Sequence, residues 1–146
     1  MEQLLSPFPG MIKNYFYLVS GILAIIFAVT HALNGQNTVL PSLNEGSVTI
    51  EVKTTTFYIW HIITAENLLF GITFIVMSVQ KNLSRVRFAA TVIAVLMIIR
   101  WIVIFGGTLL YNASALKNIL VDTIAIAIYV FLIFLGTKVK DKQVAA

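Results

Sequence analysis

Four stretches of the sequence are each long and apolar enough to cross a lipid bilayer, and this feature limits the fold more than any other. They lie at about residues 15–34, 56–79, 88–110 and 119–137. A hydrocarbon core of ~30 Å requires about 20 residues of α-helix at ~1.5 Å per residue. Hydrophobic residues make up 59% of the chain and charged residues 11%, against roughly 25% charged residues in a soluble domain. The sequence therefore predicts an all-α integral membrane protein with four transmembrane helices.

Little of the chain lies outside these stretches, so we expect residues 1–146 to form a single transmembrane domain. Backbone polar groups in lipid must be hydrogen-bonded within the protein, which favours helices for all four spans. The longest connector, residues 35–55, is predicted to be an outer loop in which Val48, Ile50 and Val52 alternate with polar residues. This alternation allows either a short strand that covers the helix ends or a solvated connector.

Basic residues near the ends of the spans predict the orientation of the helices, because short cytoplasmic loops collect Lys and Arg. Most basic residues outside the spans precede the first span, separate the second from the third, or follow the fourth. Only Lys53 and Lys117 lie on the other side. We therefore predict an up-down-up-down bundle with both termini in the cytoplasm. The net charge of +4 also indicates affinity for anionic lipid head groups. The sequence has no basic patch with interleaved aromatic residues, so we do not expect nucleic-acid binding.

Small residues follow one face of the first span, where they would allow a second membrane helix to approach closely. At 100° per residue this face consists of Gly21, Ala24, Ala28, His31, Ala32 and Gly35. The second span has a comparable small or polar face, formed by Trp60, Thr64, Asn67, Gly71 and Ser78. In the fourth span Asp122 shares a face with Tyr129 and Gly136, so it is predicted to point into the bundle.

Two charged residues, Glu66 and Arg100, lie near the middle of the predicted spans. Counting from the outer helix ends places Glu66 at a depth of ~16 Å and Arg100 at ~15 Å. A lone charge at this depth costs about 2.5–3.5 kcal/mol on insertion scales, so opposite charges on consecutive helices should pair. We predict an intramembrane ion pair between Glu66 and Arg100. Its role is either structural, fixing helix register and partner choice, or functional, as a proton relay or a site for a charged head group.

The only two histidines, His31 and His61, are predicted to lie with Asp122 in an outer layer near the water interface. Two imidazoles and a carboxylate suit Zn²⁺, Cu²⁺ or non-haem Fe²⁺, and two imidazoles could be the axial ligands of a haem. Alternatively, the histidines hydrogen-bond their neighbours or form a proton-sensing or quinone site, where Trp60 could stack on a planar ligand. No metal-binding pair of residues occurs on one helix, so each ligand interpretation requires convergence in the tertiary structure.

The segments THALNGQNTVLPSL and FYIWHIIT resemble a pattern found in uncharacterised small four-helix bacterial membrane proteins. In that pattern a histidine closes the first helix, a loop with a glycine follows, and Trp-His opens the second helix. His31, Trp60 and His61 are the matching positions, and Glu66 is a weaker match. The resemblance covers roughly residues 30–70. It implies a four-helix fold in a bacterial inner membrane, and it carries no reaction or ligand.

Sequence motifs for conventional catalysis are missing from the chain: it has no cysteine, no P-loop and no nucleotide-binding fingerprint. Neither paired broken helices nor an inverted repeat indicates a transporter. We therefore predict a non-enzymatic subunit in the lipid bilayer, either an accessory protein of a larger membrane complex or a homo-oligomer. The alternative is a membrane component that binds a metal, a haem or a quinone through His31 and His61.

Overall fold

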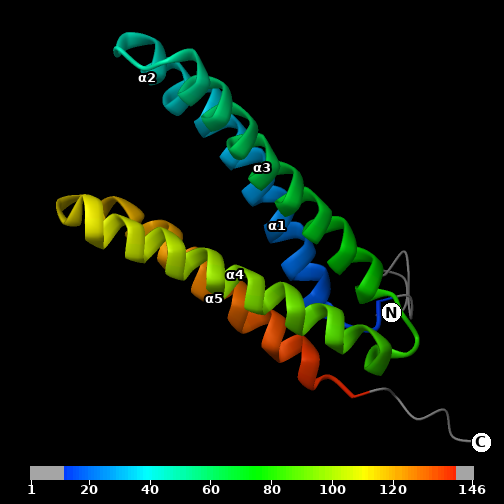
Figure 1. The fold of residues 1–146 in the computed structure, drawn as a ribbon. Helices are drawn as coiled ribbons and strands as arrows, with labels where there is room; N and C mark the ends of the chain where they lie inside the picture. The colour runs from blue at the N-terminus through cyan, green and yellow to red at the C-terminus, as the bar shows by residue number, and fades with distance from the viewer. Residues whose placement is uncertain (1–11, 141–146) are drawn as a thin grey trace, which may run out of the picture. The chain divides into compact units, whose positions relative to one another are not determined.

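The computed structural model describes residues 12–140, and it is helical over most of this range (Figure 1). In chain order the elements are α1 (Tyr15–Asn34), the π-helix η2 (Gly35–Val39), α2 (Leu40–Glu45), α3 (Ile50–Ser78), α4 (Leu83–Tyr111), the 3₁₀-helix η3 (Ala113–Ile119) and α5 (Leu120–Lys138). Among the described residues, four continuous helical stretches are long and apolar enough to cross a membrane, namely Tyr15–Glu45, Ile50–Ser78, Leu83–Tyr111 and Ala113–Lys138. This confirms the predicted all-α class and the presence of four helices long and apolar enough to span a membrane, although their bounds differ from the predicted ones.

The described residues divide into two units. The first unit contains residues 12–20 and 74–140, and the second contains residues 21–73. Helices α4 and α5 therefore belong to the first unit, together with the start of α1 and the end of α3. The second unit holds the rest of α1 and α3, connected by η2 and α2.

In the second unit α1 and α3 pack side by side as an antiparallel hairpin (Figure 1). A Cβ atom placed on Gly71 would lie 3.0 Å from the carbonyl oxygen of Gly21 and 2.6 Å from Ile25, so a glycine is required for this approach. The predicted small faces form this contact: Gly21, Ala24 and Ala28 are buried on α1, and Gly71 is buried on α3. Between helices in lipid such close packing provides much of the stability, because lipid tails are as apolar as the side chains.

Most of residues 35–55 is helical and no strand occurs in residues 12–140, so neither the solvated connector nor the strand is observed over most of this segment. Its position on the outer side stays a prediction. In η2 the backbone N–H of Leu40 donates to the carbonyl of Gly35, five residues earlier. Pro41 then falls in the first turn of α2, where the fixed φ of proline fits a helix. The helix therefore continues past residues that usually end one.

Helix α3 begins at Ile50, well before the predicted start at residue 56. The side-chain oxygen of Thr49 accepts a hydrogen bond from the backbone N–H of Val52 at 3.5 Å, which is the role of a helix N-cap. Glu51 occupies the first turn, where its negative charge interacts favourably with the helix dipole. These start signals outweigh the alternation of Val48, Ile50 and Val52 that favoured a strand.

In the first unit α4 and α5 also pack antiparallel (Figure 1). Arg87 Nη2 donates to the carbonyl of Val139 at 2.8 Å near one end of the pair. Farther along, Trp101 Nε1 donates to Thr123 Oγ1 at 3.1 Å. Helix α4 starts at Leu83, because the side chain of Asn82 accepts a hydrogen bond from the N–H of Arg85 at 3.3 Å.

Aromatic side chains form the core of the first unit. The ring of Phe74, on α3, lies 5.5 Å from the ring of Tyr17 on α1 and 6.1 Å from the ring of Tyr129 on α5. All three side chains are buried, together with Ile133. Within residues 12–140 the buried share of the spans is nevertheless small, because only 17% to 28% of an 18-residue apolar window of each span is buried. Most of the surface of the spans is therefore available to lipid or to other proteins.

Candidate functional site

The predicted site residues His31 and Trp60 lie together in the second unit, near the end of the hairpin that carries α2. The imidazole of His31 stacks on the indole of Trp60, with ring centroids 4.3 Å apart and an interplanar angle of 7°. Trp60 Nε1 donates a hydrogen bond to the backbone carbonyl of His31 at 2.9 Å. The same indole lies over Gly35, where a Cβ atom would be 2.1 Å from Nε1. Glycine at position 35 thus leaves the space that the indole occupies.

His61 lies in the same unit and also has protein partners. Its Nε2 atom lies 3.1 Å from the amide nitrogen of Gln36, and its ring makes an edge contact with Phe57 at 4.5 Å. An amide nitrogen only donates hydrogen bonds, so Nε2 of His61 is the acceptor in this contact. The lone pair of Nε2 becomes available to a metal only when Gln36 moves away.

The predicted convergence of both histidines with Asp122 stays a prediction, because Asp122 belongs to the first unit and the histidines belong to the second. Asp122 is exposed in the first turn of α5, a position where a carboxylate stabilises a helix. The inward orientation predicted for it stays a prediction, because the second unit is not placed relative to the first. Within residues 12–140, no group of three or more His, Asp or Glu side chains is arranged to hold a metal ion. A metal, haem or quinone at His31, His61 and Trp60 likewise stays a prediction.

The predicted partners Glu66 and Arg100 lie in different units, Glu66 on α3 and Arg100 on α4. Glu66 is exposed and Arg100 is half-buried. At ~1.5 Å per residue, Glu66 lies about 18 Å from the end of α3 at Ser78, and Arg100 lies about 26 Å from the start of α4 at Leu83. The observed helix ends do not by themselves give equal depths, because α4 starts earlier than predicted. The ion pair stays a prediction.

A buried polar junction in the first unit was not predicted. Asn14 is 1% exposed; its Nδ2 atom donates to the carbonyl of Gly136 at 2.8 Å, and its Oδ1 atom accepts from the N–H of Tyr17 at 3.2 Å. The backbone N–H groups of Lys13 and Asn14 both donate to the carbonyl of Ser78, at 2.8 and 3.0 Å. Asn14 thereby connects the start of α1 with the ends of α3 and α5. An asparagine just before an apolar run is a helix-start signal, but its contacts with α3 and α5 have no sequence signal.

Comparison of the chain with protein-family models, with curated proteins and with solved structures found no match. The resemblance to small four-helix bacterial membrane proteins therefore stays a prediction. The function has to be argued from the geometry of the described residues.

Proposed function

We propose that this chain is a non-enzymatic subunit of a bacterial inner membrane that acts by assembling with further copies of itself or with a larger membrane complex. The observation that carries the proposal is the position of Glu66 in the interior of the apolar helix α3, sixteen residues from its start and twelve from its end. A charged group in the middle of a bilayer is costly against lipid, so it marks a helix surface that meets protein. The small buried share of each span supports the same conclusion.

Arg100 is the partner we propose for Glu66, within one chain or between neighbouring chains. Arg85 and Arg87, the other basic residues of α4, lie in its first two turns, whereas Arg100 lies deep in the helix. Opposite charges in a low-dielectric environment attract strongly and tolerate few alternative arrangements. Such a pair would specify helix register and the choice of partner.

In this proposal the four helices cross the membrane in alternating directions, with both termini in the cytoplasm. The antiparallel pairing of α1 with α3 in one unit, and of α4 with α5 in the other, supports an up-down order of the spans. The distribution of Lys and Arg outside the spans supports the direction.

His31 and His61 have a packing role in this proposal. Each imidazole contacts an aromatic ring of α3, and His61 also joins α3 to Gln36 of η2. These contacts hold the α2 end of the hairpin together and require no bound ligand. Visible absorption spectra and elemental analysis of the purified protein would test the alternative, since a stoichiometric metal or haem would contradict a purely packing role.

Substitutions of Glu66 and Arg100 test the proposal. Glu66→Gln or Arg100→Gln alone should strongly reduce the yield of folded protein, because the remaining charge loses its partner at a cost of about 3–5 kcal/mol. Glu66→Leu combined with Arg100→Leu should restore most of that yield. Glu45→Gln is the matched control, since it removes an exposed carboxylate from the short helix α2 and should have little effect.

The oligomeric state in lipid nanodiscs, measured by cross-linking and mass photometry, separates the two possible roles of the pair. A double leucine variant that folds as a monomer, where the native chain assembles, would place the pair between subunits. A variant that folds and still assembles would make the pair a packing feature within each chain. A native chain that is monomeric in lipid, co-purifies with no other protein and tolerates both single substitutions would overturn the proposed function.

A further inference from the structure

An apolar groove with a volume of about 440 Å³ runs between α4 and α5 in the first unit. Its lining includes Ile98 and Trp101 on α4, and Thr123, Ala127, Val130 and Phe134 on α5. The side-chain nitrogen of Trp101 and the hydroxyl of Thr123 hydrogen-bond each other, so these polar groups satisfy one another. From Thr123 to Phe134 the groove extends ~16 Å along the helix axis. A long apolar groove of this kind fits a hydrocarbon chain.

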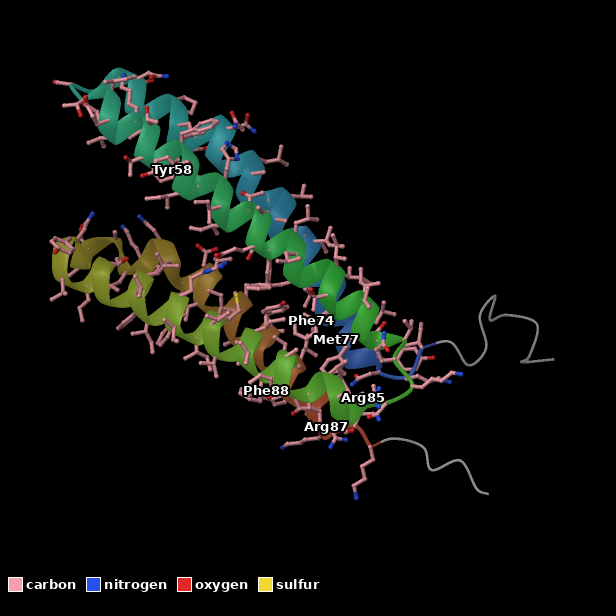
Figure 2. All side chains as sticks on the ribbon, turned by 45° about the vertical axis from the view of Figure 1, so that its right-hand side comes forward. Tyr58, Phe74, Met77, Arg85, Arg87 and Phe88 are labelled. Atoms are coloured by element: carbon pink, nitrogen blue, oxygen red, sulfur yellow. The ribbon has the colours of Figure 1, made fainter. Side chains whose placement is uncertain are left out.

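One end of the groove leads to basic side chains. Lys138 follows Phe134 by four residues and therefore lies on the same face of α5. On α4, Arg87 precedes Ile98 by eleven residues, which places it within about 20° of the same face. The hydrogen bond from Arg87 Nη2 to the carbonyl of Val139 shows that the two helix ends lie together. Figure 2 labels Arg87 at this end of the α4–α5 pair.

The charge at this end of the groove is unbalanced. Between residues 67 and 146 the sequence contains two acidic residues: Asp122, which lies in the first turn of α5 at the far end of the pair, and Asp141, which is outnumbered by Lys138, Lys140 and Lys142 around it. The Nε atom of Arg87 is buried and has no hydrogen-bond partner within residues 12–140. Arg87 and Lys138 therefore present positive charge that complements an anionic group.

We propose that this groove binds one anionic phospholipid, with an acyl chain along the groove and the phosphate at Arg87 and Lys138. Basic pockets between transmembrane helices are known to hold anionic head groups. A second copy of this chain fits the groove less well, because a copy inserted in the same orientation brings its own Arg87 and Lys138 to the level of the basic end and supplies no anionic group for it. The lipid supplies both the apolar chain and the negative charge.

Trp101 lines the groove and provides the readout. The chain has two tryptophans, so Trp60→Phe leaves Trp101 as the only indole. In phosphatidylcholine vesicles containing this variant, acyl-brominated phosphatidylglycerol should quench Trp101 at a lower mole fraction than acyl-brominated phosphatidylcholine does. Circular dichroism tests whether Trp60→Phe keeps its helices. If that variant loses them, the Trp101 signal is obtained as the difference between the native chain and Trp101→Phe.

Substitutions at the basic end and in the groove test the two parts of the proposal. Lys138→Gln should weaken the preference for phosphatidylglycerol about five-fold, the ratio that corresponds to ~1 kcal/mol for a basic residue near anionic lipid. Arg87→Gln should have a similar effect, and Arg87→Lys should keep most of the preference. Ala127→Phe should reduce quenching by both lipids, because Ala127 lines the groove. Arg85→Gln is the matched control, since Arg85 lies about 160° from Arg87 around α4.

Equal quenching by the two lipids, or an equal loss with Arg85→Gln and Lys138→Gln, would overturn the proposal. Quenching by neither lipid would also overturn it. In that case cross-linking through Ala127→Cys would show whether a second copy covers the groove.

Discussion

Replacing Gly35 with alanine is expected to destabilise the α1–α3 hairpin, because the new methyl group would occupy the position of the Trp60 indole. A Cβ atom at residue 35 would lie 2.1 Å from Trp60 Nε1 and 2.4 Å from Cδ1, far inside van der Waals contact. The indole then has to leave the position where it stacks on His31 and donates to the carbonyl of that residue. Both interactions should be lost together.

The magnitude follows from these contacts. The hydrogen bond contributes about 0.5–1.5 kcal/mol and the stacked pair about 0.5–1.5 kcal/mol beyond its buried area. Alanine recovers up to about 1 kcal/mol, because glycine is the less favourable residue in a helix. The net loss in the free energy of unfolding should be about 1–2 kcal/mol. Gly106→Ala and Gly107→Ala are matched controls, since a Cβ atom at either position meets nothing within 4 Å, and both should be neutral or stabilising.

The assay combines stability with the fluorescence of one tryptophan. In a Trp101→Phe background Trp60 is the only indole, so its emission reports the position of the ring. Denaturant titration in mixed micelles should show an earlier transition for Gly35→Ala, together with a shift of the emission maximum. If Gly35→Ala leaves the emission maximum unchanged and is as stable as the Gly106→Ala control, the indole does not lie over Gly35 and the reasoning is refuted.

Two further substitutions are expected to affect helix packing more strongly than matched changes elsewhere. Gly71→Ala should lower the free energy of unfolding by about 3 kcal/mol, because the new Cβ would meet the backbone oxygen of Gly21, which cannot rotate away. The same denaturant titration in micelles measures this loss. A loss below about 1 kcal/mol would contradict the close approach of α1 and α3. Asn14→Ala should cost about 2–3 kcal/mol, because it leaves the buried carbonyl of Gly136 without its side-chain donor and removes the cap of α1. Asn118→Ala, at an exposed position of η3, should change the stability by less than about 0.5 kcal/mol, and equal losses for the two asparagines would refute the role of Asn14.

The sequence by itself determined the helical class and the number of spans. Lipid offers no hydrogen-bond partners, so an apolar segment of this length is restricted to a helix whatever its neighbours are. The same periodic reasoning identified the small face of α1 and the small or polar face of α3, because side chains at helical spacing share a face in any α-helix. The buried residues Gly21, Ala28 and Gly71 lie on those faces.

Local start and stop signals were less reliable. The connector over residues 35–55 was predicted to be a loop, yet the helix continues through Gly35 and Pro41, because the space at Gly35 accommodates an indole from α3 and the fixed φ of Pro41 fits the first turn of α2. Thr49 and Glu51 are helix-start signals for α3. The alternation of Val48, Ile50 and Val52 instead favoured a strand at the same place.

Only the tertiary structure decided which side chains meet. It showed that the imidazole of His31 stacks on Trp60 and that His61 lies in hydrogen-bond contact with Gln36, contacts that the residue types alone do not give. Asn14 and Gly136 are 122 positions apart in the chain, and their hydrogen bond depends on the packing of α1 with α5. Such contacts cannot be read from periodicity, because periodicity gives the face of a residue on its own helix and says nothing about which residue of another helix lies opposite.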